Sequence, residues 1–130
     1  MRYVRQRHIT GCGVASTAML AGTNYDKALK AVRPDRKPGG CACSSLKDMI
    51  KGLEKLGYKP RLSYKNVRLS AVKENAMIIV RNPGRGHAGL HVVVWDAENR
   101  RILDPWDRPS KFTIDEAYVK KYHEYRIFLA

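Results

Sequence analysis

The sequence predicts an α+β fold in which N-terminal helices pack on a C-terminal antiparallel sheet. In the first 57 residues, small and apolar side chains recur at helical spacing. From residue 58 onwards, short runs rich in valine, isoleucine and tyrosine alternate with turn residues, which is typical of strands. Helices first and strands afterwards give an α+β arrangement. At 130 residues, the chain is expected to form a single domain over residues 1–130, without internal repeat or linker.

Two helices are predicted near the N-terminus. The first covers residues 13–21, whose side chains are nearly all compact, so it is expected to be central and buried. Gly22 follows, at the position where glycine commonly ends a helix. A second helix is predicted over residues 25–32, with Asn24 as its N-cap and Pro34 as the residue that stops it.

A third helix is predicted to begin at Ser45, because Ser45 and Asp48 have the spacing of a capping box. Gly57 closes it. The lysines of this helix lie mostly on the face opposite its apolar side, which indicates a solvated surface. The apolar face consists of Leu46, Met49, Ile50, Leu53 and Leu56.

The second half of the chain is predicted to form the sheet. Residues 98–99 separate two of the strands, which are therefore expected to form a hairpin. A loop is predicted over 82–86, and the short segment 69–74 is left unassigned. Thr113 opens a capping-box pattern that predicts a short helix to about Lys121. The predicted strands cover residues 58–64, 76–80, 90–96, 101–103 and 125–129.

The chain is strongly basic, with a formal net charge of +13. The first 65 residues carry 14 Lys and Arg against 4 Asp and Glu, whereas the other 65 carry 11 against 8. Such an excess favours acidic partners, such as nucleic acid, an anionic surface or an acidic protein. A solubilising surface explains the charge equally well, because no basic run is dense enough to indicate one partner.

The sequence contains no membrane or export signal that we recognise. No apolar run approaches the ~20 residues that span a bilayer, so no membrane partner is expected. The first eight residues lack the apolar core of a secretion signal, and a cytoplasmic location is therefore expected.

The three cysteines are an odd number, which argues against a disulfide framework. Cys41 and Cys43 could coordinate a soft metal, but the chain has no second cysteine pair to complete four ligands. They are interpreted as two small residues of the glycine-rich turn over 38–43. No metal and no cofactor is expected.

Cys12 is the candidate nucleophile. It lies where the first helix begins, and a helix N-terminus stabilises the thiolate that attacks a substrate. Gly11 and Gly13 add no side-chain bulk beside the sulfur, so a substrate carbonyl is expected to approach closely. The alternative is a small buried cysteine at a helix start.

His91 and Asp104 are the candidate partners of this thiol. If the hairpin turns near residues 97–98, Asp104 lies opposite His91, and a turn one residue later puts it on the diagonal. Either register lets the carboxylate orient the imidazole. His91 would then serve as general base toward Cys12 and as general acid to the leaving group.

Other residues compete for these roles. His87 is a second candidate base, but it lies in the glycine-rich loop, where positioning is looser. Asp96 and Asp107 are weaker candidates for the orienting carboxylate, and Asp104 itself could be a turn residue. His91 could equally be a satisfied histidine at the end of a strand.

Gln6 is the candidate oxyanion donor. Its side-chain amide could donate to an oxyanion that forms next to Cys12, with the Cys12 backbone N–H as second donor. Preorganised donors of this kind typically contribute ~3 kcal/mol. Taken alone, Gln6 reads as a surface residue.

In the order Gln6, Cys12, His91 and Asp104, these residues resemble papain-like cysteine peptidases. The likeness is strongest to the C39-like branch, which includes the bacteriocin-leader peptidase domains of export transporters. It implies that Gln6 is the oxyanion residue, Cys12 the nucleophile, His91 the base and Asp104 the orienting residue. The matching motifs are Gln6…Gly11-Cys12-Gly13, Ser44-Ser45…Leu46…Leu53…Gly57, His91-Val92-Val93-Val94 and Leu103-Asp104-Pro105.

Two differences from the C39-like branch limit which of its properties are expected of this chain. Val92 stands where the branch often has an aromatic residue. The chain also shows no transporter segments, so leader removal coupled to export is not implied. No propeptide is expected, because Gln6 and Cys12 are almost at the start.

These observations predict a cysteine peptidase that cleaves a peptide or isopeptide bond through a Cys12 acyl-enzyme. Its partner would be a peptide or protein substrate, and the basic surface favours acidic residues near the cut. Two alternatives stay open. One is an acyltransferase with the same triad, and the other is a basic binding module for nucleic acid or an acidic protein, with Cys12 idle.

Overall fold

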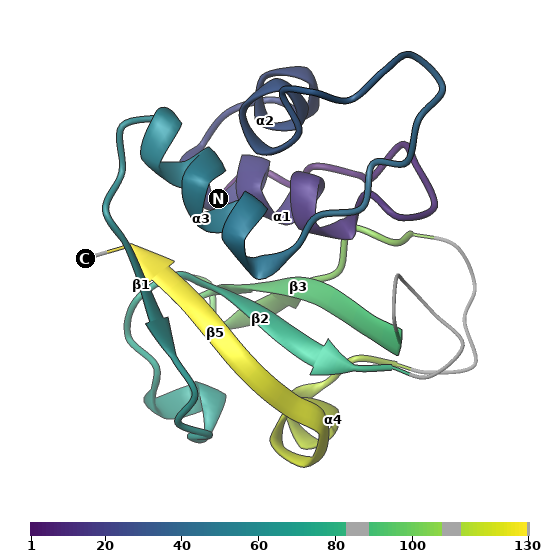
Figure 1. Ribbon diagram of the computed structural model, residues 1–130. Coiled ribbons are helices and arrows are strands. Elements are labelled where there is room, and N and C mark those ends of the chain that lie inside the picture. Colours follow the sequence, from purple (N-terminus) through teal and green to yellow (C-terminus); the bar gives the residue numbers. More distant parts are fainter. Residues whose placement is uncertain (83–88, 108–112, 130) are drawn as a thin grey trace.

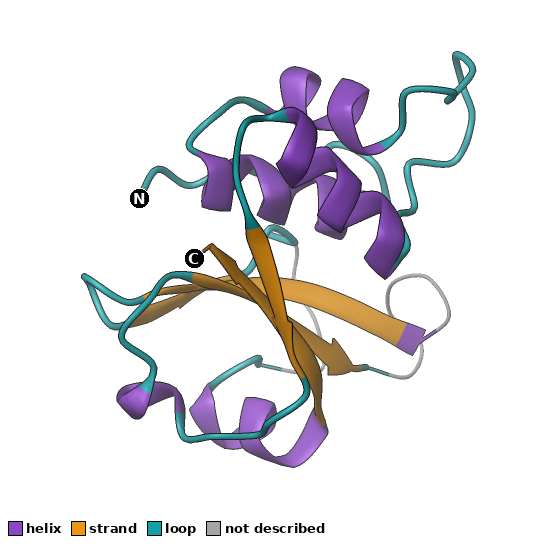
Figure 2. Cartoon of the chain, turned by 60° about the vertical axis from the view of Figure 1, so that its left-hand side comes forward, coloured by secondary structure: helices purple, strands orange, loops and turns teal. Residues whose placement is uncertain are grey.

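The computed structural model describes residues 1–82, 89–107 and 113–129 (Figure 1). A twisted antiparallel sheet lies between two groups of helices, as Figure 2 shows from the side. The elements in chain order are α1 (Cys12–Ala21), α2 (Tyr25–Val32), α3 (Leu46–Lys55), β1 (Pro60–Ser63), the 3-10 helix η1 (Leu69–Ala71), β2 (Ala76–Arg81), β3 (Leu90–Asp96), β4 (Arg101–Leu103), α4 (Glu116–Tyr122) and β5 (His123–Leu129).

The five strands follow the order β1-β5-β2-β3-β4, and every neighbouring pair is antiparallel. The last strand in the sequence, β5, is thus inserted between β1 and β2 (Figure 1). The helices α1, α2 and α3 lie on one side of the sheet, and α4 and η1 on the other (Figure 2). The predicted α+β class, with N-terminal helices on an antiparallel sheet, is confirmed.

Helix α1 is the centre of the first layer. All ten of its residues are buried, which matches a helix with no polar face. Gly22 ends it with a φ of 68°, in the left-handed region that favours glycine. The predicted central helix is therefore confirmed, and it begins at Cys12, one residue earlier than expected.

The sheet separates two apolar cores because successive strand residues point to opposite faces. On the side of α1 and α3, Met77 and Ile79 of β2 pack with Val92 and Val94 of β3. On the side of α4 and η1, the intervening residues of the same strands form a second cluster with Val119. Two buried faces explain why these strands read as continuous apolar runs in the sequence.

Local signals predicted the helices α2 and α3 well. Helix α2 has the expected bounds, and the Asn24 side chain accepts from the Lys27 N–H at 2.9 Å. Both hydrogen bonds of the capping box between Ser45 and Asp48 are present at the start of α3. The hairpin of β3 and β4 is likewise confirmed with the expected strand bounds.

Several boundaries differ from the prediction. Strand β1 is shorter than the predicted 58–64, and the unassigned segment 69–74 contains the 3-10 helix. Strand β5 begins at His123 rather than at residue 125. The N-cap of α4 is Asp115, not Thr113, because the Asp115 side chain accepts from the Tyr118 N–H at 2.8 Å. Of the predicted loop over 82–86, only Asn82 lies within the described residues.

The interpretation of Cys41 and Cys43 as two unlinked small residues is wrong. The two cysteines form a disulfide, and Cys12 is the free cysteine. An odd cysteine count argues against a network of long-range bridges, but it says nothing about a local bridge across one intervening residue. None of the described helices is both long enough and apolar enough to cross a membrane.

Candidate active site

Cys12 is the first residue of α1 and is buried, with 7% of its surface exposed. The preceding turn is closed by a hydrogen bond of 3.0 Å from the Gly11 N–H to the His8 carbonyl. The first backbone N–H groups of a helix have no intrahelical acceptor, and the helix dipole is positive at this end. The sulfur therefore lies where negative charge is stabilised.

His91, near the start of β3, lies between a carboxylate and this sulfur. Its Nε2 is 2.7 Å from Oδ1 of Asp104. A carboxylate can only accept, so Nε2 carries the proton in this hydrogen bond. The other ring nitrogen, Nδ1, is then free to accept a proton, and Cys12 is close enough to the ring to raise the pKa of His91. The structure thus brings Cys12, His91 and Asp104 together.

Several effects act on the pKa of His91. Burial lowers it, whereas the hydrogen bonds to Asp104 and Cys12 and the charges of both groups raise it. The net effect is a pKa above the ordinary histidine value of 6.5. The site therefore favours an imidazolium next to the sulfur, which is the charge arrangement that activates a thiol.

The hairpin register explains how Asp104 reaches His91. Val94 pairs with Leu103, so the turn is the later of the two that the sequence allowed, and Asp104 lies on the diagonal from His91. Arg100 in this turn has a φ of 52°. Asp104 follows the end of β4, and its Oδ1 also accepts from the Trp106 N–H at 3.0 Å. That second donor holds the carboxylate in place.

Gln6 is buried on the N-terminal segment, with 6% of its surface exposed. Its Nε2 donates to the carbonyls of His8 and Ile9, each at 2.9 Å. Both hydrogens of the amide therefore have an acceptor in the resting structure. Its Oε1 is buried and accepts nothing from the described residues. The amide group supports the turn that leads into Cys12.

A feature that sequence reasoning missed is the pairing of the N-terminal segment with the residues after β4. The Gln6 N–H donates to the Pro105 carbonyl at 3.0 Å, and the Tyr3 hydroxyl donates to the Asp104 carbonyl at 2.6 Å. Arg5 and Asp107 form an ion pair at 3.0 Å. These contacts join two segments about 100 residues apart, one of which carries Gln6 and the other Asp104.

A second missed feature is a polar network behind the Cys12 turn. His8 Nδ1 is 2.7 Å from the Tyr25 hydroxyl, and His8 Nε2 is 3.2 Å from Nη2 of Arg36. Burial, together with the charges of Arg36 and Arg7, lowers the pKa of His8 and keeps it neutral. No motif indicated this network, since its members belong to three separate segments.

Gly11 and Gly13, which add no side-chain bulk beside the sulfur, are also closely packed against neighbouring side chains. A Cβ on Gly11 would overlap the Tyr25 hydroxyl, and a Cβ on Gly13 would overlap the Ser44 hydroxyl and lie 3.0 Å from Met49 Sδ. The protein fills the space that the two glycines leave. Their role is to let neighbouring side chains pack against the backbone on either side of Cys12.

A cleft of about 280 Å³ opens beside Cys12. Thr10 and Ser44 lie at its polar side, and the rest of its wall is largely apolar. It is formed by α1, the start of α3 and the strands β2, β3 and β5. Its apolar lining residues are Leu46, Met49, Ile79, Leu90, Val92 and Tyr125. The cleft can therefore take an apolar side chain of a ligand whose carbonyl reaches the sulfur.

The competing candidates lie elsewhere or outside the described residues. Asp96 is at the far end of β3, where it binds Asn99 and Arg101. Burial raises its pKa, but these two hydrogen-bond donors lower it more, so Asp96 stays charged. Asp107 is paired with Arg5, and His87 lies outside the described residues. Within the described ranges, no group of three or more potential metal ligands comes together.

Comparison with solved structures identifies the fold. The peptidase domain of Streptococcus ComA, a bi-functional ABC transporter involved in a quorum-sensing pathway, superposes with a TM-score of 0.67 at 21% identity, over 99% of this chain and 98% of that domain. The peptidase domain of Streptococcus mutans ComA gives 0.60 at 20% identity, over 100% of this chain and 99% of that domain. The latter domain bound to a small-molecule inhibitor gives 0.57 at 18% identity, over 100% and 99%.

No protein-family model matches the chain, and no curated protein sequence matches it. The structural likeness covers nearly the whole chain, so this chain has the fold of these peptidase domains. At these identities the likeness concerns the fold alone.

Proposed function

We propose that this chain is a cysteine peptidase that cleaves a peptide or isopeptide bond with Cys12 as nucleophile. One observation carries the proposal: the His91 imidazole is hydrogen-bonded to Asp104, and Cys12 lies close enough to it to raise its pKa. The fold shared with peptidase domains and the cleft beside Cys12 support it.

The mechanism follows from the positions of these groups. The Cys12 thiolate attacks the substrate carbonyl, and the C=O electron pair moves to oxygen. His91 then gives its Nδ1 proton to the leaving amine as the C–N bond breaks, which leaves an acyl-enzyme on Cys12. In the second half, His91 takes a proton from water, and the hydroxide attacks the acyl carbon. The C–S bond breaks, and the carboxylic acid leaves the Cys12 thiolate next to the protonated His91. Asp104 keeps the imidazole oriented and stabilises its charged form.

The oxyanion of the tetrahedral intermediate needs two donors. The backbone N–H of Cys12 is one, because it belongs to the first turn of α1. Gln6 is the other in our proposal. Its Nε2 would exchange one of its two carbonyl acceptors, His8 or Ile9, for the oxyanion. A hydrogen bond formed only with the developing charge accelerates the chemical step.

Active-site labelling tests the proposal. The protein is incubated with a panel of peptides that carry a carbonyl-adjacent electrophile, and the modified residue is identified by mass spectrometry. We expect one adduct on Cys12, with preference for an apolar side chain next to the electrophile. Cys12→Ala should lose the adduct, and His91→Ala should retain the thiol but react far more slowly. Equal reaction of wild type and His91→Ala would contradict the proposal.

A further inference from the structure

The disulfide between Cys41 and Cys43 lies outside the proposed catalytic groups, in the segment that connects α2 with α3. Cys41 is exposed, whereas Cys43 is only partly exposed. The bridge spans a single residue, Ala42, which is itself buried. A solvent-exposed sulfur in a bridge that crosses no other element is accessible to an attacking thiol.

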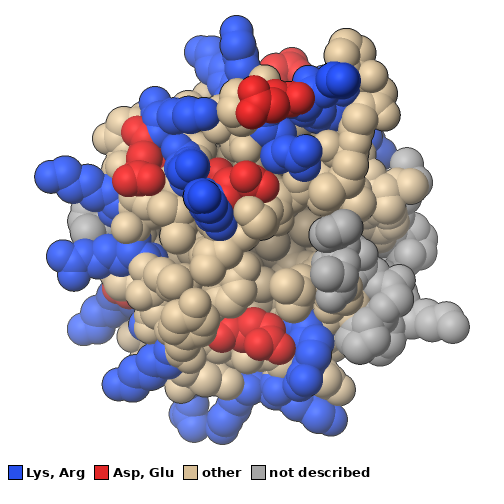
Figure 3. All heavy atoms as spheres, viewed as in Figure 1, with Lys and Arg blue, Asp and Glu red and all other residues tan. Residues whose placement is uncertain are grey.

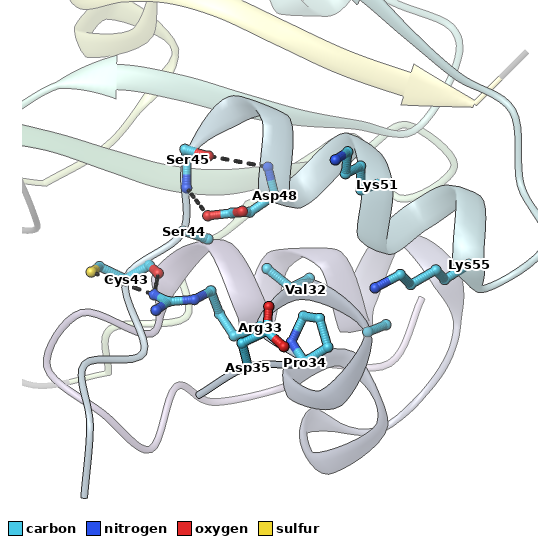
Figure 4. A pocket seen from close by; sticks show the side chains of 11 residues that line it. Val32, Arg33, Pro34, Asp35, Cys43, Ser44, Ser45, Asp48, Lys51 and Lys55 are labelled. Atoms are coloured by element: carbon cyan, nitrogen blue, oxygen red, sulfur yellow. Dashed lines mark hydrogen bonds between the residues drawn. The ribbon is translucent and has the colours of Figure 1, made fainter. Parts of the chain in front are cut away.

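Each sulfur of this bridge has polar neighbours. Nη1 of Arg33 donates to the carbonyl of Cys43 and lies 3.7 Å from its Sγ (Figure 4). The Cys43 N–H donates to Sγ of Cys41 at 3.2 Å, and the Thr10 hydroxyl is 3.4 Å from the same sulfur. A guanidinium and hydrogen-bond donors next to sulfur stabilise the thiolate form.

We propose that Cys41 and Cys43 form a reversible thiol–disulfide exchange site for a low-molecular-weight thiol. The thiolate of that molecule attacks the exposed Cys41 sulfur, a mixed disulfide forms, and the S–S electron pair leaves on Cys43 as a thiolate next to Arg33. A second thiol then attacks the sulfur of the small molecule in the mixed disulfide. Cys41 leaves as thiolate, and the small molecule departs as its own disulfide, so two electrons reduce the protein and two thiols are oxidised.

The exchange site is connected to the cleft beside Cys12. Ser44 directly follows Cys43, and its hydroxyl packs against Gly13, the residue after Cys12. Thr10, which contacts Cys41, also lines the cleft together with Ser44. Opening the bridge releases the segment over 41–44, which carries Ser44 and contacts Thr10 through Cys41. The inference that the redox state changes peptidase activity rests on the function proposed above, whereas the exchange chemistry does not.

The exchange chemistry is tested in a Cys12→Ala background, where Cys41 and Cys43 are the remaining cysteines. The protein is equilibrated with mixtures of reduced and oxidised glutathione and then alkylated. Its mass is measured by intact-protein mass spectrometry. We expect the number of alkylated cysteines to change from zero to two as the mixture becomes more reducing. In an added Cys43→Ser variant, Cys41 should retain one glutathione. Two free thiols under every mixture would overturn the proposal.

The role of Arg33 in the exchange is tested by substitution. Lys51, which lines the same hollow between α2 and α3, serves as the matched control. Arg33→Gln removes the cation beside the Cys43 sulfur and should slow reduction by glutathione by about tenfold, because a poorer leaving thiolate departs more slowly. Lys51→Gln removes an equal charge that lines the same hollow, and it should leave the rate unchanged. Arg33→Lys should recover part of the rate. Equal rates in Arg33→Gln and Lys51→Gln would overturn the assigned role of Arg33.

The coupling to activity is measured separately. The double variant Cys41→Ser/Cys43→Ser, which cannot form the bridge, should show kcat/KM lowered by about tenfold relative to the oxidised wild type, because Ser44 and Thr10 lose their fixed positions. An unchanged kcat/KM overturns the coupling. If neither protein cleaves peptides or takes the electrophile, the proposed function fails, while the exchange result in Cys12→Ala still stands.

Discussion

His91 is a residue at which burial and specific partners act in opposite directions. Burial alone would lower its pKa, as it does for His8 and His123, whose arginine neighbours add to the effect. Asp104 and Cys12 reverse the outcome for His91. A buried imidazole with a raised pKa is held there by its partners, and this is the pattern expected of a functional rather than a packing histidine.

Asp104→Asn should lower the pKa of His91 and reduce stability in a defined pH range. A folded-state pKa above the unfolded value of about 6.5 means that protonation of His91 stabilises the fold. This stabilisation is fully present below the unfolded pKa and is lost as pH rises through the folded pKa. We therefore expect wild type and variant to differ by about 1.5–3 kcal/mol at roughly pH 5–6, between the ordinary pKa values of a carboxyl group and a histidine. The difference should shrink toward alkaline pH, as measured by urea unfolding.

A pH-independent difference between wild type and Asp104→Asn would contradict the electrostatic pairing. The matched control is Asp107→Asn, which removes an exposed carboxylate of the same segment that pairs with Arg5 instead. Its effect on stability should be small at all pH values, since exposed ion pairs contribute little.

Gln6 gives a prediction on the chemical step. Gln6→Ala should reduce kcat by roughly 100-fold with little change in KM, because the donor acts on charge that forms only in the transition state. Gln6→Glu should be at least as impaired, since a carboxylate repels an oxyanion. Steady-state kinetics on the best peptide of the labelling panel measures both. A Gln6→Ala variant with raised KM and normal kcat would assign Gln6 to ground-state binding instead.

At the scale of helices and strands, the features that depend on residues close in sequence were predicted, and those that depend on distant residues were not. Helices α2 and α3 were predictable because their caps, Asn24 and Ser45, act within four residues. The α1 helix was recognisable from its compact side chains alone. The insertion of β5 between β1 and β2 was not predictable, because strand order depends on pairings between distant segments.

In the candidate site, too, local sequence signals could be used for prediction, whereas contacts between distant segments could not. Cys12, His91 and Asp104 were identifiable because residue type, order and hairpin register restrict them strongly. The hydrogen bonds from Gln6 to Pro105 and from Tyr3 to Asp104 join the two ends of the chain, and no local pattern encodes them. The short Cys41–Cys43 bridge was missed because cysteine counting addresses pairings between elements.

The packing of α2 on α3 depends on one glycine. A Cβ on Gly52 would lie 2.6 Å from Cγ2 and 3.1 Å from Cα of Val32, so a larger side chain must push the helices apart. Gly52→Ala should therefore destabilise the protein by about 1–3 kcal/mol despite the better helix propensity of alanine. Denaturant unfolding measures this, with Glu54→Ala on the exposed face of α3 as the control. A more stable Gly52→Ala variant would contradict the close approach.

At the scale of the whole molecule, positive charge is in excess, with a formal net charge of +13. Figure 3 shows Lys and Arg side chains spread over the visible face, with Asp and Glu among them. Exposed arginines near the site, Arg5 and Arg7, pair with Asp107 and Asp26. A field of this kind attracts acidic partners over a distance rather than at a defined contact.

Salt dependence tests this long-range role. For peptides with acidic residues near the scissile bond, kcat/KM should fall several-fold between about 50 and 200 mM salt, because salt screens the net charge of +13. For neutral peptides of equal length it should change little. Equal salt dependence for both peptide sets would argue against electrostatic selection of acidic substrates.

The contact between Cys12 and His91 is the centre of the proposed chemistry, and NMR titration of the His91 ring tests it most directly. The midpoint is compared between wild type and Cys12→Ala. Since Cys12 raises the pKa of His91, we expect a lower midpoint in Cys12→Ala. The midpoints of His8 and His123 should stay in place. An identical His91 midpoint in the two proteins would mean that Cys12 and His91 do not interact.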